Sequence, residues 1–126
     1  MRALPILSRA LALAFAAAFV VHLLALVHPS PADTSPAWRH AVFLGVNAIL
    51  AIGFARCVRW LFVPVLVFAA QQATSHGIDF VSALRNGGLD VTSLLVLIVL
   101  PVVVVVAFLL QRRPRAVSSR PTTAQM

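Results

Sequence analysis

The chain has 126 residues, of which 61% are hydrophobic and 10% are charged. A soluble domain is about 45–50% apolar and about 25% charged. A chain this short buries only about two thirds of the surface that its unfolded form exposes, so it cannot hide this much apolar surface from water. The composition therefore excludes an ordinary soluble domain and indicates a protein that contacts the lipid bilayer.

Charge and cysteine content exclude further classes of protein. The net charge is +7, but the ten basic residues, all Arg, flank apolar runs and form no continuous basic face. This pattern excludes a nucleic-acid partner. Cys57 is the one cysteine in the chain. A single thiol forms neither an internal disulfide nor a Cys-x-x-Cys pair, so thiol–disulfide exchange is excluded as an activity.

Four apolar stretches predict four transmembrane helices. A helix needs roughly 20 residues to cross the hydrocarbon core, and its backbone must pair within the segment. The sequence therefore predicts an all-α integral membrane protein, folded as an antiparallel helical bundle within residues 1–111. Only a tight turn at 56–59 separates the second stretch from the third, so we expect these two to form a helical hairpin. The expected spans are about 5–27, 38–55, 60–76 and 91–110.

The segments outside the spans differ in kind. Residues 77–90 form the longest connector. A short interfacial helix is predicted there by Ile78, Phe80, Val81 and Leu84. Asn86-Gly87-Gly88 predicts the end of that helix. Residues 112–126 are rich in Arg, Pro, Ser and Thr and predict a disordered cytoplasmic tail.

The first apolar stretch has a second interpretation, as a signal peptide. Arg2 and Arg9 precede its uncharged part, residues 10–27, as in the basic region of such a peptide. Against this, the run is longer than the 7–15 residues typical of a signal-peptide core, and it contains His22. Cleavage would leave three spans with the same orientation.

Arginine placement predicts the orientation in the membrane. With the N-terminus in the cytoplasm, eight Arg lie on the cytoplasmic side, while Arg39, Arg85 and all three Asp lie outside. The positive-inside rule therefore favours an N-in/C-in topology. The Arg-only, Ala- and Val-rich composition is typical of a bacterial inner (cytoplasmic) membrane protein. The residues expected to anchor the spans at the two membrane surfaces are Arg56, Arg59, Arg112, Arg113, Trp38 and Trp60.

Polar residues within apolar helices are the candidates for a functional site. In the predicted topology all four His lie in the outer half of the molecule. Gln72 and His76 are four residues apart and share one helix face, and His40 and Asn47 are two turns apart on one stripe. These faces predict a polar pocket open to the outer side, with the candidate residues His22, His40, Asn47, Gln71, Gln72, His76 and Asp79.

Three functional interpretations follow. The sequence contains no nucleophile–base set and no phosphate-binding loop, which favours a non-catalytic accessory component whose partners are the bilayer and either other membrane subunits or a second copy. The alternative is a redox or metal-handling protein that binds haem or a divalent metal through His22, His40 and His76, since imidazole is a ligand for both. A third is a small oligomeric transporter. Proton-coupled antiport through a buried acid is disfavoured because no Asp lies in an expected span.

Overall fold

The computed structural model describes residues 3–29 and 35–113, and this part of the chain is helical and contains no strand. Each of its long helices is long and apolar enough to cross a membrane, which confirms the predicted fold class at this level. The expected tail beyond Arg113 lies outside the described residues. The helices are α1 (Ala3–Val27), α2 (Ala37–Ala55), the 3₁₀ turn η1 (Arg59–Leu61), α3 (Phe62–Arg85) and α4 (Val91–Gln111).

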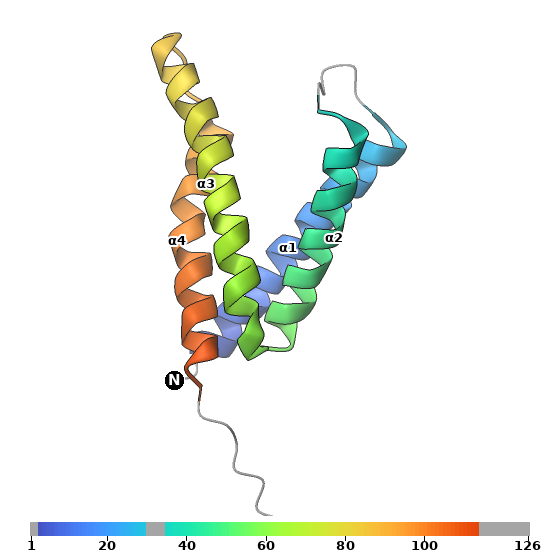
Figure 1. Cartoon of the computed structure of the whole chain (residues 1–126), viewed down its shortest axis with the longest axis vertical. Coiled ribbons are helices and arrows are strands. Elements are labelled where there is room, and N and C mark those ends of the chain that lie inside the picture. Colours follow the sequence, from blue (N-terminus) through green and yellow to red (C-terminus); the bar gives the residue numbers. More distant parts are fainter. Residues whose placement is uncertain (1–2, 30–34, 114–126) are drawn as a thin grey trace, which may run out of the picture.

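The four helices form two hairpins that diverge from a common end (Figure 1). Helix α1 packs along α2, and α3 packs along α4, whereas α2 and α3 separate as they leave η1. We call the end where the hairpins meet the closed end and the opposite end the open end. The expected hairpin of the second and third spans is therefore wrong. A short connection places two helices next to each other in the chain, but side-chain packing decides which helices stay in contact.

The partner choice of α2 follows from the residues on α1. This helix is rich in Ala, and small side chains let two helices approach closely. At the closed end Ser8 Oγ donates a hydrogen bond to the Phe54 carbonyl (2.5 Å), and the Phe15 and Phe54 rings stack with centroids 5.6 Å apart. On the other hairpin, Phe62 of α3 packs against Phe108 of α4. Each hairpin therefore has its own aromatic contact near the closed end.

The hydrophobic core lies at the closed end and joins the hairpins. Leu61 of η1 and Phe54 of α2 are fully buried there. A Cβ at Gly53 would lie 2.5 Å from Leu61 Cδ1, so the absence of a side chain at Gly53 makes room for Leu61. Arg59 Nε also donates to the Gln111 carbonyl at the end of α4 (2.9 Å). The core consists of Leu11, Ala12, Phe15, Leu50, Phe54, Leu61, Val65, Val103, Val106, Ala107 and Leu110.

Helix α3 continues past the predicted span end at His76 to Arg85, so the expected separate interfacial helix is wrong. Gly77 lies within the helix and has no other group within 4 Å of its missing Cβ, so nothing there forces a break. The helix ends where Gly87 adopts φ 73°, a left-handed conformation that suits glycine. The Gly88 N–H then donates to the Ala83 carbonyl (2.9 Å). The Asn86-Gly87-Gly88 signal thus marks the end of α3 itself.

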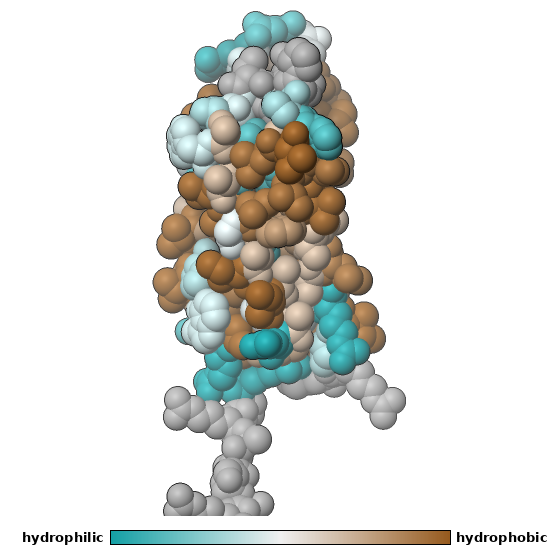
Figure 2. Space-filling model, turned by 90° about the vertical axis from the view of Figure 1, so that its right-hand side faces the viewer, coloured by the Kyte–Doolittle hydropathy of each residue, from teal (hydrophilic) through white to brown (hydrophobic). Residues whose placement is uncertain are grey.

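The surface has an apolar belt between two hydrophilic ends. Figure 2 shows apolar residues across the middle of one face and hydrophilic residues at both ends. Trp38 and Trp60, on opposite ends of the molecule, are 67% and 60% exposed. Among the described residues, the open end carries Arg39, Arg85, Asp79 and Asp90, whereas the closed end carries Arg9, Arg56, Arg59, Arg112 and Arg113.

Candidate ligand-binding cleft

A cavity of about 640 Å³ lies between the two hairpins and is lined by all four helices. We call it the cleft. Its deep part is apolar and is formed by residues such as Leu11, Phe15, Leu100 and Val103. Six of the seven residues predicted to form a polar pocket line the cleft, most of them nearer the open end: His22, His40, Asn47, Gln72, His76 and Asp79. That these residues act as a functional site stays a prediction.

His22 and His40 contact each other directly. Their Nδ1 atoms are 3.2 Å apart, and the two residues come from α1 and α2 of the same hairpin. One Nδ1 must carry the proton and donate, while the other must be bare and accept, so the two rings have opposite protonation at Nδ1. The His22 ring also stacks on Phe43 with centroids 5.3 Å apart. The pair therefore forms an ordered polar contact on the α1–α2 wall of the cleft.

His76, on the opposite wall, is oriented by a chain of hydrogen bonds. The Ser93 hydroxyl donates its only proton to Asp90 Oδ2 (2.5 Å) and lies 3.0 Å from His76 Nδ1. The hydroxyl must therefore accept at this second contact, and His76 Nδ1 is the protonated donor. The remaining ring nitrogen, Nε2, is a lone-pair acceptor whenever the ring is neutral. His76 thus brings a defined tautomer to the cleft.

Asp90 accepts the hydrogen bond from the Ser93 hydroxyl and also caps the N-terminus of α4. Its Oδ1 accepts from the Ser93 N–H (3.0 Å), the standard N-cap contact. The hydrogen bond from the Ser93 hydroxyl lowers the pKa of the Asp90 carboxyl most, and the bond from the Ser93 N–H lowers it further below its ordinary value of 3.8. The Thr92 N–H and the charge of His76 add smaller effects in the same direction, against a raising effect of burial. Asp90 is therefore a carboxylate at neutral pH.

Arg39 connects the two walls at the open end. Its Nη2 donates to Ser75 Oγ (3.2 Å), which joins α2 to α3 across the cleft. Its guanidinium carbon also lies 6.0 Å from the centre of the Phe43 ring, at the outer limit of a cation–π contact. Arg39 therefore places a permanent positive charge on the cleft beside His40.

Two amides supply polar groups deeper in the cleft. Asn47 is 3% exposed, and its Nδ2 donates to the Phe43 carbonyl of its own helix (2.8 Å). Gln72 is 9% exposed and lines the cleft, yet its amide forms no hydrogen bond with any residue that the structure describes. No side-chain N or O atom that is buried among the described residues lacks a partner, so the amide atoms of Gln72 are open to the cleft. Gln72 thus offers a donor and an acceptor to whatever fills the cleft.

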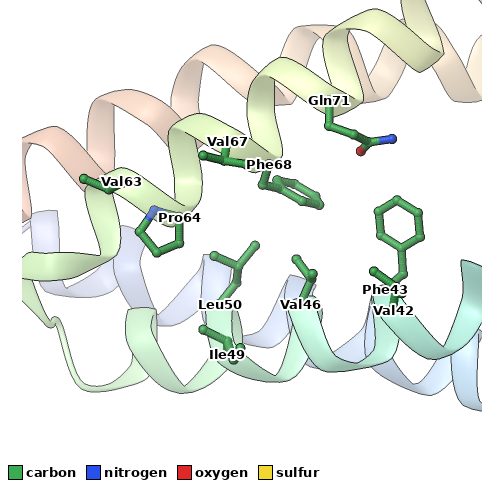
Figure 3. A pocket seen from close by; sticks show the side chains of 10 residues that line it. All are labelled: Val42, Phe43, Val46, Ile49, Leu50, Val63, Pro64, Val67, Phe68 and Gln71. Atoms are coloured by element: carbon green, nitrogen blue, oxygen red, sulfur yellow. The ribbon is translucent and has the colours of Figure 1, made fainter.

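A second, apolar groove of about 390 Å³ separates α2 from α3 on the side of the molecule shown in Figure 3. We call it the lateral groove. Gln71, the seventh predicted pocket residue, lines this groove instead of the cleft. Phe43 and Phe68 line both spaces, so the groove adjoins the cleft. In Figure 3 their rings point from α2 and α3 toward the space between the two helices.

The structure divides the three predicted metal ligands between two walls. His22 and His40 are in contact on one hairpin, whereas His76 is bonded to Ser93 on the other. Within residues 3–29 and 35–113, no group of three or more His, Cys, Asp or Glu is placed to hold a metal ion. The three-histidine metal site therefore stays a prediction. In this structure His22, His40 and His76 are not brought together.

The sequence did not predict Arg39 as a cleft residue, the contact of Ser93 with His76, or the position of Asp79 within a helix. Asp90 and Ser93 have the Asp-x-x-Ser spacing of a helix N-cap, so their mutual contact was readable from the sequence. The contact of Ser93 with His76 could not be predicted from the sequence, because it joins α4 to α3. Asp79 lies inside α3 and not in a connector, which followed from the missed extension of that helix. For Arg39 the sequence predicts only a place on the outer side, because its bond to Ser75 joins two helices that the fold brings together.

A comparison of the chain with protein-family models, curated proteins and solved structures finds no match. Any functional conclusion must therefore come from the cleft, since a helical bundle by itself does not specify an activity.

Proposed function

We propose that the protein is a four-span bacterial inner-membrane protein with both termini in the cytoplasm and its open end outside. The support is the distribution of charge over the two ends. Arg56, Arg59 and Arg112 lie at the closed end, and both described Asp lie at the open end. Short arginine-rich loops stay in the cytoplasm.

Cysteine accessibility tests this topology. The single Cys57 lies in the closed-end turn. In intact cells a membrane-impermeant maleimide should label an Asn86→Cys variant made in a Cys57→Ser background, and should leave the wild-type chain unlabelled until the membrane is opened. Labelling of Cys57 but not of position 86 in intact cells would reverse the proposed orientation.

We further propose that the protein is a non-catalytic accessory component that binds an amphipathic molecule in the cleft. The observation that carries this proposal is the polarity gradient of the cleft, from Phe15 and Val103 in the deep part to Arg39 and the histidines at the open end. Ligand sites are concave, mostly apolar and supplied with a few polar groups that fix orientation. The cleft has this composition.

Bound compounds test this function directly. Native mass spectrometry of the protein extracted in mild detergent should detect a bound small molecule. Gln72→Leu should release most of it, because the substitution removes a polar group from the cleft while keeping the side-chain volume. Gln111→Leu is the matched control, since Gln111 is exposed at the closed end. Equal occupancy in the two variants would contradict binding in the cleft.

A second candidate function is haem or metal binding in the same cleft. The observation that favours it is the Asp90–Ser93–His76 chain, because ligating histidines usually donate their second ring N–H to such a partner. The purified protein would then show a haem Soret band or near-stoichiometric metal. His76→Ala would remove that signal, and His28→Ala, at the exposed end of α1, would keep it. A colourless, metal-free protein would contradict this candidate.

A further inference from the structure

We propose that the cleft takes a single-chain amphiphile with an anionic head group, held by Arg39 and Gln72, and that its apolar chain leaves through the lateral groove. This inference rests on the proposed binding function and names the chemical class of the ligand. Three independent features carry it: the charges at the open end, the amide of Gln72 that faces the cleft and the position of the lateral groove.

The charges at the open end favour an anion. Arg39 carries the one permanent positive charge among the residues that line the cleft. His22, His40 and His76 surround the same space as neutral or cationic groups, and Asp79 is the one acid in that lining. Asp79 is exposed at the rim. A carboxylate or phosphate suits a guanidinium best, because its oxygens accept two parallel N–H bonds.

Gln72 indicates that the head group has hydrogen-bond acceptors. Its side chain is nine-tenths buried, lines the cleft and has no hydrogen-bond partner among the described residues. Because no side-chain N or O atom that is buried among the described residues lacks a partner, the amide atoms of Gln72 face the open space of the cleft and can bond to a ligand there. An anionic oxygen can accept from the amide Nε2, and Arg39 supplies the balancing charge nearer the open end.

The lateral groove gives the apolar chain a path into the bilayer. Its walls are aliphatic and aromatic, with Val46 on α2 and Val67 on α3, and Gln71 is its one polar residue. Phe43 and Phe68 border both the groove and the cleft, so a chain that starts beside Arg39 reaches the groove by passing these two rings (Figure 3). One groove of this kind accommodates one chain, which indicates a single-chain lipid.

Competition binding tests the head group. The full-length protein is placed in phosphatidylcholine nanodiscs, and binding of tritiated palmitate is measured. Unlabelled palmitate and hexadecyl phosphate should compete. Hexadecanol, hexadecyltrimethylammonium, acetate and inorganic phosphate should not, because each lacks either the anion or the chain. Competition by hexadecanol at the same concentration as palmitate would overturn the anionic head group. Competition by inorganic phosphate alone would overturn the requirement for a chain.

Two pairs of variants test the assigned residues. Arg39→Gln should weaken palmitate binding about tenfold, the cost of losing one charge-assisted contact, while Arg85→Gln, also at the open end but outside the cleft, should not. Val67→Trp should fill the lateral groove and weaken palmitate more than hexanoate, whereas Val81→Trp, on the same helix outside the groove, should affect neither. Unchanged palmitate binding in Arg39→Gln or Val67→Trp would overturn the corresponding contact.

Ligand binding in the cleft and the anionic class of the ligand are tested separately. Elution volume and circular dichroism verify that each variant is folded. If a neutral molecule co-purifies, depends on Gln72 and is not displaced by palmitate, the cleft binds a ligand and the anionic class is wrong. If neither palmitate nor any Gln72-dependent compound binds, the proposed binding function fails as well.

Discussion

The two ends of the molecule differ in packing and polarity. At the closed end Phe54, Leu61 and Val65 are completely buried. At the open end the hairpins diverge, and polar side chains line a cavity that the protein does not fill. Core packing at one end holds the hairpins together, and its absence at the other leaves room for a ligand. The difference places the packed core at one end of the bundle and the proposed binding site at the other.

The largest effect on stability is expected at the closed end, from Phe54→Ala. Removing a fully buried ring that stacks on Phe15 leaves a cavity between α1 and α2. The free energy of unfolding, measured by SDS titration in mixed micelles, should fall by about 3 kcal/mol. Ile52→Ala on the same helix, where the side chain is 55% exposed, should cost less than about 0.5 kcal/mol. Equal losses would show that the closed end is not the core.

A smaller loss is expected from Ser93→Ala, next to His76 of the cleft. Ser93 is 1% exposed, and its hydroxyl connects His76 to Asp90. Its removal takes away the contact of His76 Nδ1 and that of Asp90 Oδ2, while Asp90 Oδ1 keeps the bond from the backbone N–H of residue 93. The free energy of unfolding should fall by about 1.5 kcal/mol. Ser82→Ala, at an exposed position near the end of α3, is the control. A loss as large as that of Phe54→Ala would contradict the contrast between the two ends.

Two glycines of α2 should respond in opposite directions to the same substitution. Gly53→Ala places a methyl group against the fully buried Leu61 and should destabilise the protein by about 1 kcal/mol. Gly45→Ala meets no atom within 4 Å and should stabilise it by about 0.5 kcal/mol through helix propensity. The difference in unfolding free energy between the two variants measures the packing at Gly53. If both substitutions changed the unfolding free energy in the same direction, close packing against Leu61 would not explain the glycine at 53.

The smallest effect concerns pH and the cap of α4. The pKa of Asp90 is lower in the folded protein than its ordinary value of 3.8, so the folded state favours the carboxylate. Its stabilising contribution is complete above the pKa of the unfolded chain and is lost as pH falls through the lower pKa of the folded state. Asp90→Asn should therefore flatten the acid side of a plot of thermal unfolding temperature against pH.

The matched control for this substitution is Asp79→Asn, an exposed carboxylate that caps no helix. It should leave the contribution of the α4 cap unchanged. If Asp79→Asn flattens the acid side of the plot as much as Asp90→Asn does, the hydrogen bonds from Ser93 are not its source.

Local signals in the sequence predicted the elements well where a single helix carried the information. The four apolar runs gave four helices, and Asn86-Gly87-Gly88 marked a helix end because Gly87 must adopt a positive φ. The helix end expected near His76 was wrong, because it was predicted from a fall in hydropathy. Gln71, Gln72 and Ser75 lower the hydropathy of α3, but hydropathy reports the environment of a helix and not its continuity, and no proline or capping residue interrupts the backbone there.

Part of the candidate site could be predicted from the sequence. The four-residue spacing of Gln72 and His76 correctly placed both on one face of α3, and both line the cleft together with His40 and Asn47. Gln71 and Gln72 are equally polar neighbours, yet they line different spaces on α3. The helix period tells which residues share a face, but the packing of α2 and α4 decides what each face meets.

The sequence by itself determined that the chain is helical and apolar enough to cross a membrane, and that its charges separate toward two ends, because composition and run length act locally. Only the tertiary structure decided that α2 pairs with α1 and not with α3, that His76 is tied to Asp90 through Ser93, and that Arg39 reaches Ser75 across the cleft. These outcomes depend on side-chain packing between helices far apart in the chain. In helices that are apolar nearly all round, the sequence pattern does not mark the packing faces.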